Sequence, residues 1–432
     1  MNTRELILDM LLEIERENTY SHILMRSVLD KYDYLTVQEK AFIKRVTEGA
    51  LERRIQIDYI IDSYSKIPVK KMKPLIRNLL RMSVYQILFM DGVPDSAICN
   101  EAVKLAGKRK FQALKGFING VLRNIVRQKD RIVYPDREKN LKEYLSIWYS
   151  MPEYLISMWI EDYGEEQAER MLQAMLAVRP VTIRLKETMS REEQEALLKK
   201  IEEAGIRVRK HSVLPYAYEL EHLDGVRSIP GFEEGLLSVQ DVSSMLCVED
   251  AGIREGDFVI DVCAAPGGKA THAAVKLKGS GKVLARDLTE EKTALIRENA
   301  ARGKLSNITV ETYDAKVYDE SLKEKADVVL ADLPCSGLGI VGKKRDIKYN
   351  ITKEALEALP LLQKEILSTV WKYVKPGGIF IYSTCTIHKE ENEKVAAWFA
   401  GNHPFELMSM RQLLPGIHET DGFFIARFKR TV

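Results

Sequence analysis

The chain has 432 residues and a net charge of +2, with 45% hydrophobic and 30% charged residues, an ordinary balance for a globular protein of two or three domains. It has no apolar run of about 18 residues and no signal-peptide layout, which argues against a membrane partner. Its five cysteines include no CxxC pair, which argues against a zinc site or a disulfide framework and favours free thiols in the cytoplasm.

Residues 1–135 have the apolar spacing of helices and are expected to form an all-α bundle. A helix that begins near Phe42 is expected to run on toward Ile61. Pro74 suits the first turn of a later helix, and Ser96 suits the cap of the next one.

This first part of the chain is also the basic part. Residues 1–140 contain 26 Lys+Arg and 18 Asp+Glu, whereas the remaining residues contain 39 and 45. Residues 66–131 alone contain 15 Lys+Arg and 4 Asp+Glu. A basic segment of this size is typical of a polyanion-binding surface, so we favour nucleic acid as its partner over a merely solvated helical surface.

Residues 150–235 mix helices and strands and are expected to form a small α+β module. From residue 236 to residue 432, strands and helices alternate, which predicts a parallel, Rossmann-like sheet with right-handed crossovers. The last strand follows the turn signal Asp421-Gly422 and is expected to insert antiparallel. The expected strands are 258–263, 282–287, 308–313, 326–332, 378–384 and 423–428. Helices are expected near 268–278, 289–302, 353–374 and 389–400.

The first of these strands runs into a glycine turn, Pro266-Gly267-Gly268, where the backbone can approach a ligand closely. The turn lacks the G-x-G-x-x-G spacing of dinucleotide-binding proteins, which disfavours NAD. Asp287, at the end of the second strand, is placed to accept hydrogen bonds from ribose hydroxyls, and Asp314 to accept one from an adenine amino group. Each alone is equally compatible with an ordinary turn residue, but together they favour S-adenosylmethionine. The candidate cofactor-binding residues are Cys263, Ala264, Ala265, Pro266, Gly267, Gly268, Lys269, Asp287, Asp314 and Asp332.

Two cysteines, Cys335 and Cys385, each follow a buried strand, so the topology places both at the ligand-binding edge of the sheet. Cys99 and Cys247 lie in apolar helices and are expected to be inert. Two thiols beside a cofactor turn favour methylation at carbon 5 of a pyrimidine, in which a thiolate adds to carbon 6 and makes carbon 5 nucleophilic. Asp332 is placed to stabilise the charge at ring nitrogen 3. The residues alone leave open which cysteine attacks.

These motifs resemble those of the RNA cytosine-C5 methyltransferases, the Nol1/Nop2/Sun group. The segments 332–337 (DLPCSG) and 383–386 (STCT) are similar to the two-cysteine signature of that family. The segment 261–269 (DVCAAPGGK) resembles its cofactor loop, and Gln240-Asp241 and 346–348 (DIK) match further family positions.

The resemblance implies that Cys385 is the nucleophile and that Cys335 assists product release, with Asp332 as the third catalytic residue. The N-terminal domain resembles the RNA-binding NusB domain at 81–86 (RMSVYQ) and 117–124 (FINGVLRN).

A NusB-like domain joined to this catalytic domain is the layout of bacterial enzymes that methylate 16S rRNA. It implies 16S rRNA, free or in an assembling small subunit, as the substrate of a monomeric enzyme. The implied domains are 1–135 (NusB-like), 150–235 (RNA-recognition-like) and 236–432 (catalytic). The alternatives are a non-catalytic RNA-binding ribosome-assembly factor and a dinucleotide-dependent oxidoreductase. The retained cysteine pair argues against the first, and the missing dinucleotide motif against the second.

Overall fold

The computed structural model describes residues 2–17, 20–32, 34–223 and 225–432. The chain forms two compact units. The first contains Met1–Leu176 together with Val341–Asn350, and the second contains Ala177–Ile340 and Ile351–Val432. A ten-residue stretch that follows the Cys335 motif in sequence is therefore part of the otherwise N-terminal unit.

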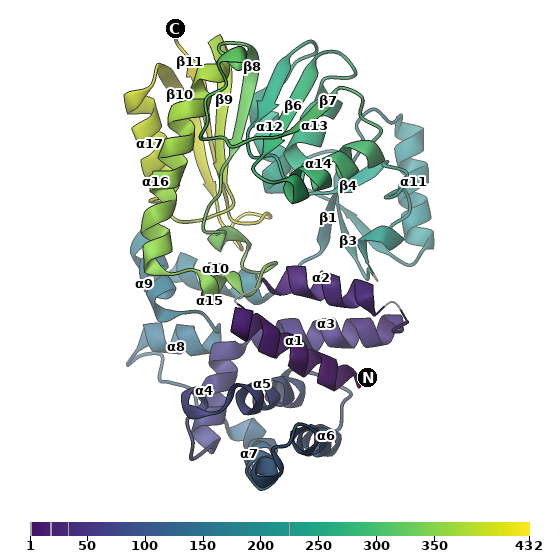
Figure 1. Cartoon of the computed structure of the whole chain (residues 1–432), viewed down its shortest axis with the longest axis vertical. Helices are drawn as coiled ribbons and strands as arrows, with labels where there is room; N and C mark the ends of the chain where they lie inside the picture. The colour runs from purple at the N-terminus through teal and green to yellow at the C-terminus, as the bar shows by residue number, and fades with distance from the viewer. Residues whose placement is uncertain (1, 18–19, 33, 224) are drawn as a thin grey trace. The chain divides into compact units, whose positions relative to one another are not determined.

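The first unit is helical and includes the all-α bundle predicted for residues 1–135 (Figure 1). Its α-helices are α1 (Thr3–Glu17), α2 (Ser21–Lys31), α3 (Val37–Glu52), α4 (Arg54–Tyr64), α5 (Pro74–Phe89), α6 (Asp95–Lys108), α7 (Lys115–Gln128), α8 (Leu141–Trp148), α9 (Glu153–Tyr163), α10 (Glu165–Leu176) and α15 (Ile347–Asn350). Short 3-10 turns lie at η1 (Val69–Lys71), η2 (Gln112–Leu114) and η3 (Lys129–Arg131).

Two helix predictions in this unit were wrong in detail. The single helix expected from Phe42 toward Ile61 is two helices, because the backbone leaves helical geometry at Arg53 (φ −98°, ψ 15°). Ser96 lies inside α6, because the extended backbone of Pro94 starts that helix two residues earlier. Pro74 does occupy the first turn of α5.

Many of the basic side chains in this unit are engaged in ion pairs. Lys108 Nζ lies 2.6 Å from Glu5, and Arg109 contacts the same carboxylate. Arg81 binds Asp58 through two nitrogens, each at 2.7 Å. Internal ion pairs thus neutralise part of the positive charge counted in the sequence.

The second unit begins with a four-stranded antiparallel sheet of order β2-β3-β1-β4, partly covered by α11 (Arg191–Glu203). Its strands are β1 (Val181–Leu185), β2 (Arg207–Lys210), β3 (Ala217–Glu221) and β4 (Leu237–Val239). A short 3-10 turn, η4 (Val226–Ser228), precedes β4. The α+β prediction is confirmed, but β4 was not predicted; it pairs with β1, and Leu237 on it is buried.

The larger sheet has seven strands in the order β10-β11-β9-β8-β5-β6-β7. Its strands are β5 (Phe258–Asp261), β6 (Lys282–Asp287), β7 (Ile308–Thr312), β8 (Ala326–Asp332), β9 (Val374–Thr384), β10 (Phe405–Leu413) and β11 (Phe423–Arg430). The strands from β9 to β7 are parallel, and β11 inserts antiparallel, as predicted. The edge strand β10 was not predicted.

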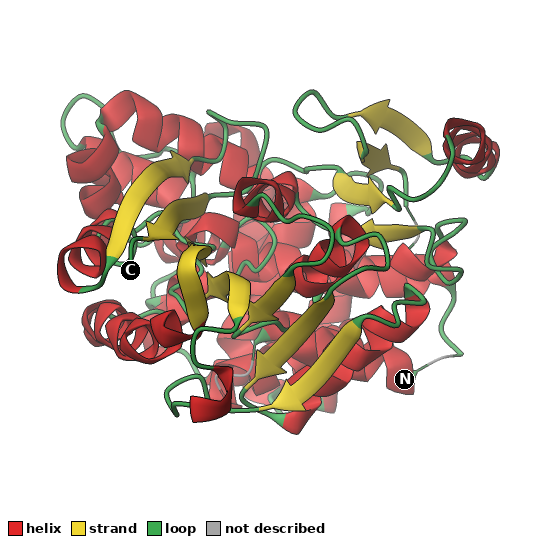
Figure 2. Cartoon of the chain, turned by 90° about the horizontal axis from the view of Figure 1, so that it is seen from above, coloured by secondary structure: helices red, strands yellow, loops and turns green. Residues whose placement is uncertain are grey.

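Helices cover both faces of this sheet, which gives the three layers of a Rossmann-like fold (Figures 1 and 2). The helices are α12 (Val242–Ala251), α13 (Gly268–Lys276), α14 (Glu290–Arg302), α16 (Lys353–Val370) and α17 (Glu393–Asn402), with 3-10 turns η5 (Glu320–Leu322), η6 (Leu338–Ile340) and η7 (Trp371–Tyr373). One apolar cluster joins the sheet to α12, α13 and α14, and another joins it to α16 and α17. The helix expected from residue 389 begins only at Glu393.

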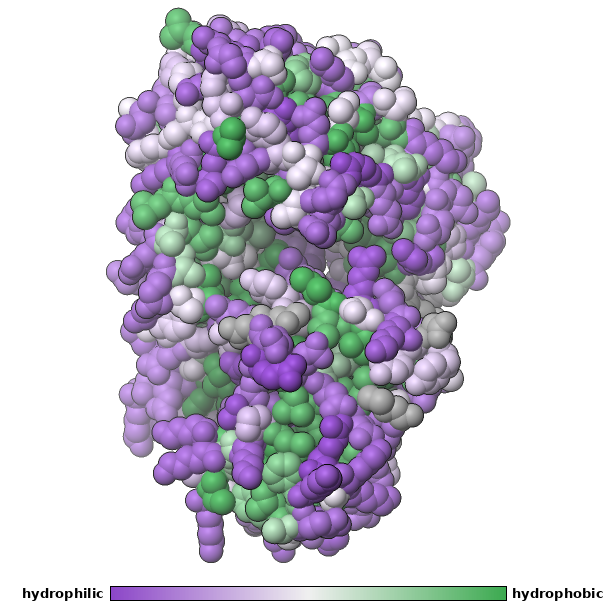
Figure 3. Space-filling view, viewed as in Figure 1, coloured by the Kyte–Doolittle hydropathy of each residue, from purple (hydrophilic) through white to green (hydrophobic). Residues whose placement is uncertain are grey.

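Charged and polar residues cover much of the face drawn in Figure 3, with hydrophobic residues in smaller groups between them. Among the described residues, no helix is both long and apolar enough to cross a membrane.

Candidate active site

The two strand-end cysteines lie in contact. Strands β8 and β9 are neighbours in register, with Asp332 opposite Ser383. Their carboxyl ends therefore bring the following loops together, and the sulfur atoms of Cys335 and Cys385 are 3.3 Å apart. Both side chains are partly exposed. The placement inferred from topology thus results in a direct thiol–thiol contact.

The environment of Cys335 favours its protonated form. The Cys385 sulfur and burial raise the pKa of the Cys335 thiol well above its ordinary value. The two loops are also joined through their backbones, since the amide of Gly339 donates to the carbonyl of Cys385 at 3.0 Å. A Cβ atom at Gly339 would lie 1.9 Å from the carbonyl oxygen of Gly422, so this approach requires glycine.

Asp332, at the end of β8, is held by two donors. Lys269 Nζ lies 2.6 Å from one carboxylate oxygen, and the hydroxyl of Ser383 donates to the other at 2.9 Å. Burial alone would lower the pKa of Lys269, but the Asp332 carboxylate outweighs it and the pKa is raised. The lysine of the predicted cofactor loop is therefore an ammonium ion that connects this loop to the proposed catalytic acid.

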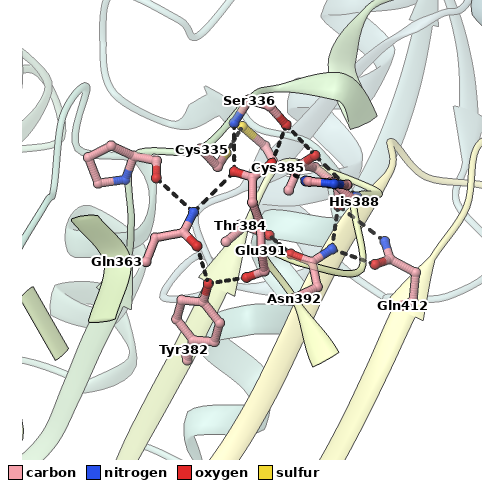
Figure 4. A network of polar contacts seen from close by, with 12 residues as sticks. Cys335, Ser336, Gln363, Tyr382, Thr384, Cys385, His388, Glu391, Asn392 and Gln412 are labelled. Carbon is pink, nitrogen blue, oxygen red and sulfur yellow. Dashed lines mark hydrogen bonds and ion pairs between the residues drawn. The ribbon is translucent and has the colours of Figure 1, made fainter. Parts of the chain in front are cut away.

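A buried carboxylate, Glu391, lies beneath the Cys335 loop (Figure 4). It accepts hydrogen bonds from the amide of Ser336 at 2.9 Å and from its hydroxyl at 2.5 Å. Gln363 donates both to Glu391 at 3.1 Å and to the carbonyl of Pro334 at 3.0 Å. A ring nitrogen of His388 lies 3.1 Å from the same carboxylate. The residues on both sides of Cys335 are therefore fixed by one polar cluster.

The next residue, Asn392, holds the Cys385 loop in a similar way (Figure 4). Its side-chain oxygen accepts from the hydroxyl of Thr384 at 2.5 Å, and its amide group donates to the carbonyl of Thr386 at 3.0 Å. Gln412, on β10, also binds Asn392 and the carbonyl of Thr386. Sequence reasoning missed Glu391, Asn392, Gln363 and Gln412. The only local signal was that two polar residues lie a few positions after Thr-Cys, within a segment expected to be helical.

The candidate cofactor loop begins where β5 ends. Gly267 has φ +108°, a conformation that favours glycine, and it starts α13. The carboxylate of Asp287 accepts from the amide of Ala265 at 2.9 Å, and the amide of Tyr313 donates to the Asp287 carbonyl at 2.8 Å. Asp314 follows directly and accepts from the amide of Lys316. The two predicted acids therefore lie on consecutive strand ends beside the loop.

The buried side chain of Asp261, which was not among the predicted cofactor-binding residues, fits a cationic cofactor. Burial raises the pKa of Asp261 to about 7, although the charge of Lys269 and the backbone amide of Cys263 oppose this shift. A positive charge next to this carboxylate would compensate for its burial. The glycine turn, the Asp287 carboxylate beside it and this buried acid together suit a cofactor with a cation and a ribose.

The remaining cysteines are unsuited to nucleophilic attack. Cys99 and Cys247 are buried in α6 and α12, as expected for inert thiols. Burial raises the pKa of both, that of Cys247 to about 12. Burial and the nearby Asp287 also raise the pKa of Cys263, so this loop cysteine stays a thiol.

Two basic residues that follow Cys335 in the sequence, Arg345 and Lys348, have their partners in α3. Arg345 binds Glu48 and Glu52 of α3, at 2.7 and 2.9 Å. Lys348 donates to the carbonyl of Glu52 at 2.8 Å, and burial lowers its pKa to about 7. Both residues are thus used inside the first unit.

Glu187, Glu249 and His272 form a cluster with metal-ligand geometry among the described residues. Lys276 Nζ lies 2.7 Å from Glu187 and also contacts Glu249, so the two acids already share one ammonium ion. Burial lowers the pKa of His272 well below its ordinary value. We interpret the cluster as a structural ion-pair network.

Comparison with known proteins agrees with this geometry. Family models match residues 252–429 to the 16S rRNA methyltransferase RsmB/F family, 1–127 to the NusB family and 151–226 to the ferredoxin-like domain of RsmF/B-like methyltransferases. A probable ribosomal RNA small subunit methyltransferase B from Bacillus subtilis (strain 168) is 33% identical over 449 residues, which cover 99% of each chain. The chain belongs to the RsmB/F methyltransferase family. A ribosomal RNA small subunit methyltransferase B from Proteus mirabilis (strain HI4320) is also 33% identical, over 93% of this chain and 92% of its own.

Solved structures agree on the fold of this RsmB/F family member. The crystal structure of PH0851 has a TM-score of 0.83 at 24% identity and covers 100% of this chain and 99% of its own. A methyltransferase homolog protein from Pyrococcus horikoshii has a TM-score of 0.58 at 27% identity, over 66% of this chain and 97% of its own. NSun6 from the same organism, solved with SFG, also has a TM-score of 0.58, at 21% identity over 65% of this chain and 98% of its own.

As a member of this family, the protein is an S-adenosylmethionine-dependent rRNA methyltransferase. The predicted fold class, the NusB-like first domain, the cofactor and the rRNA methyltransferase activity are confirmed. The oxidoreductase and the non-catalytic assembly factor are not retained as alternatives.

Proposed function

We propose that this RsmB/F family enzyme methylates carbon 5 of a cytosine in 16S rRNA through a covalent bond between Cys385 and carbon 6 of the base. The observation that carries the proposal is the contact of Cys335 and Cys385, 3.3 Å apart at two neighbouring strand ends, with Asp332 ion-paired to Lys269 on the first of these strands. Two thiols beside a carboxylate–ammonium pair are the groups that addition to a pyrimidine and later elimination need.

The first step is the attack of Cys385. Its thiolate bonds to carbon 6, and the electron pair displaced from the 5,6 double bond makes carbon 5 nucleophilic and builds negative charge at ring nitrogen 3. In the Asp332–Lys269 pair the Lys269 ammonium can donate toward that charge, and a proton passed to Asp332 would make its carboxyl group a donor as well. When bound, S-adenosylmethionine would offer carbon 5 an electrophilic methyl group, whose bond to the sulfonium sulfur breaks as the new carbon–carbon bond forms and leaves a neutral thioether. The assignment of the nucleophile to Cys385 follows the two-cysteine signature of the related RNA methyltransferases.

The second step is the release of the product. Carbon 5 now carries a methyl group and a hydrogen. When its proton passes to solvent, the electron pair re-forms the 5,6 double bond and the bond between Cys385 and carbon 6 breaks. We assign Cys335 to this step, because a thiol with a raised pKa keeps its proton and can hydrogen-bond the departing sulfur.

The cofactor is assigned to the loop of residues 263–269 and the strand ends beside it. Backbone groups around Gly267 would approach it closely, Asp287 would accept from its ribose hydroxyls, and Asp314 from its adenine amino group. Asp261 would face its positive charge. This assignment rests on the geometry of the loop and on its similarity to the family's cofactor loop.

For the whole chain, we propose the order NusB-like domain (1–135), ferredoxin-like module (150–235) and catalytic domain (236–432). The first two would bind 16S rRNA, free or in an assembling small subunit, and a monomer would carry out the reaction in the cytoplasm. The basic excess of residues 66–131 supports a role in RNA binding.

The test is the transfer of tritiated methyl groups from S-adenosylmethionine to unmodified 16S rRNA and to small subunits that lack the methyl group. Wild type should place the label in 5-methylcytosine, and Cys385→Ala should place none. Cys335→Ala should accumulate an RNA–protein adduct, seen as a slowed band on a denaturing gel. Cys335→Ser keeps a hydrogen-bond donor and should accumulate less. Label in another base, normal turnover by Cys385→Ala, or no label with either substrate would overturn the proposal.

A further inference from the structure

The two thiol loops are held by two consecutive residues. Glu391 and Asn392 are fully buried, although both side chains are polar. Their backbone turns so that each side chain reaches a different loop (Figure 4). Burying a carboxylate fully costs free energy unless hydrogen-bond donors surround it. The burial of Glu391 therefore indicates that its side chain serves these contacts and not helix formation.

Glu391 holds the loop of Cys335 on one side of the pair. Its carboxylate binds both the amide and the hydroxyl of Ser336, the residue that follows Cys335. Gln363 links the same carboxylate to the carbonyl of Pro334, the residue that precedes Cys335. The hydroxyl of Tyr382 donates to the backbone carbonyl of Glu391 and so anchors the carboxylate to β9.

Asn392 holds the loop of Cys385. Its side chain binds the hydroxyl of Thr384 and the carbonyl of Thr386, the two neighbours of Cys385. The two halves are joined by one further hydrogen bond, 2.7 Å long, between the hydroxyls of Ser336 and Thr386. The separation of the thiols is therefore set by a continuous chain of buried hydrogen bonds.

We propose that Glu391 and Asn392 are positioning residues with separate effects on the reaction. Glu391 holds Cys335 against the sulfur that departs during release, and Asn392 holds Cys385 for the attack. This inference rests on the proposed covalent mechanism. It predicts that the two adjacent residues, when substituted, block different steps.

The variants Glu391→Met and Asn392→Leu remove the hydrogen bonds at similar side-chain volume. Loss of a well-placed proton donor costs about 10²-fold or more in rate, so turnover by Glu391→Met should fall by about that factor. Its RNA adduct should accumulate, because Cys385 is still positioned. Asn392→Leu should lose turnover and adduct together. Both variants should bind S-adenosylmethionine within about twofold of wild type, which also reports on folding.

Glu391→Gln is the matched control. Its remaining oxygen can still accept from the amide of Ser336 and from Gln363. Its new amide group can donate to the Ser336 hydroxyl, which can act as an acceptor. It should therefore recover most of the turnover and show little adduct. A role limited to stability would give no difference in adduct between the variants at Glu391 and Asn392.

The inference is overturned if Glu391→Met turns over like wild type, or if it loses cofactor binding or adduct in the same way as Asn392→Leu. Failure of the underlying mechanism gives a different result. In that case Cys335→Ala, with the Glu391–Asn392 pair intact, would also accumulate no adduct. An adduct with Cys335→Ala but none with Glu391→Met would reject only the positioning role.

Discussion

The buried carboxyl group of Asp261 should make the stability of the catalytic unit depend on pH. Burial raises its pKa to about 7, roughly three units above an ordinary aspartate. Below about pH 4 the folded and unfolded chains both hold the proton, so Asp261 makes no difference. As the pH rises toward 7 the unfolded chain ionises first, and the folded unit loses stability. Above about pH 7 both are ionised and the loss stays constant, at about 4 kcal/mol at most, from 1.36 kcal/mol per unit.

The variant Asp261→Asn should therefore match wild type near pH 4 and become progressively more stable than wild type toward pH 8. Native-state hydrogen exchange of the amides in β5 and β8 measures this locally, without assuming that the two units unfold together. Glu406→Gln, on the exposed edge strand β10, is the control and should show no such trend. A difference between Asp261→Asn and wild type that does not change with pH would refute the argument.

Three further predictions follow from the other contacts. Lys269→Met leaves the Asp332 carboxylate without its ammonium partner, so single-turnover methylation should fall by about 10²-fold or more, with a smaller loss for Lys269→Arg. Gly339→Ala brings a methyl group to 1.9 Å from the Gly422 oxygen and should cost roughly 1–3 kcal/mol of stability as well as activity, measured by thermal unfolding and methylation assays. Gly401→Ala, with open space around it, should reduce neither stability nor activity. Reversing the charges of the exposed Lys70 and Lys71 should reduce the salt dependence of rRNA binding by roughly one unit of slope per lost phosphate contact. Lys108→Met, which removes the partner of Glu5, should mainly lower stability. An unchanged slope would show that the exposed lysines are only solvated.

The sheet was predictable from the sequence where its strands are buried on both faces. Strand β8, for example, has four consecutive apolar residues at 328–331, and such runs alternate with helices as expected for a parallel sheet. The edge strand β10 was missed because most of its residues are exposed and its pairing with β11 gives no apolar periodicity. The break between α3 and α4 was missed because neither glycine nor proline marks Arg53.

The site was predictable only in the part that topology determines. Cys335, Cys385 and Asp332 follow strand ends, and parallel neighbours bring their ends to one edge. Glu391 was not predictable, because acidic residues are also favoured in the first turn of a helix and the segment resembles one. Its actual role depends on donors that are 28 and 55 positions away in the sequence, on Gln363 and Ser336.

The delayed start of α17 is what gives the two thiols different surroundings. Had the helix begun at residue 389, helical geometry would have set the directions of the Glu391 and Asn392 side chains, about 100° apart around one axis. Because the helix begins at Glu393, Glu391 and Asn392 lie in a tight connection after β9 and hold one loop each. The resulting sulfur separation of 3.3 Å allows a hydrogen bond between the thiols, yet it is well above the roughly 2.05 Å of a disulfide. A connection that fixes both loops therefore keeps the thiols close enough for one to assist the departure of the other while both remain free.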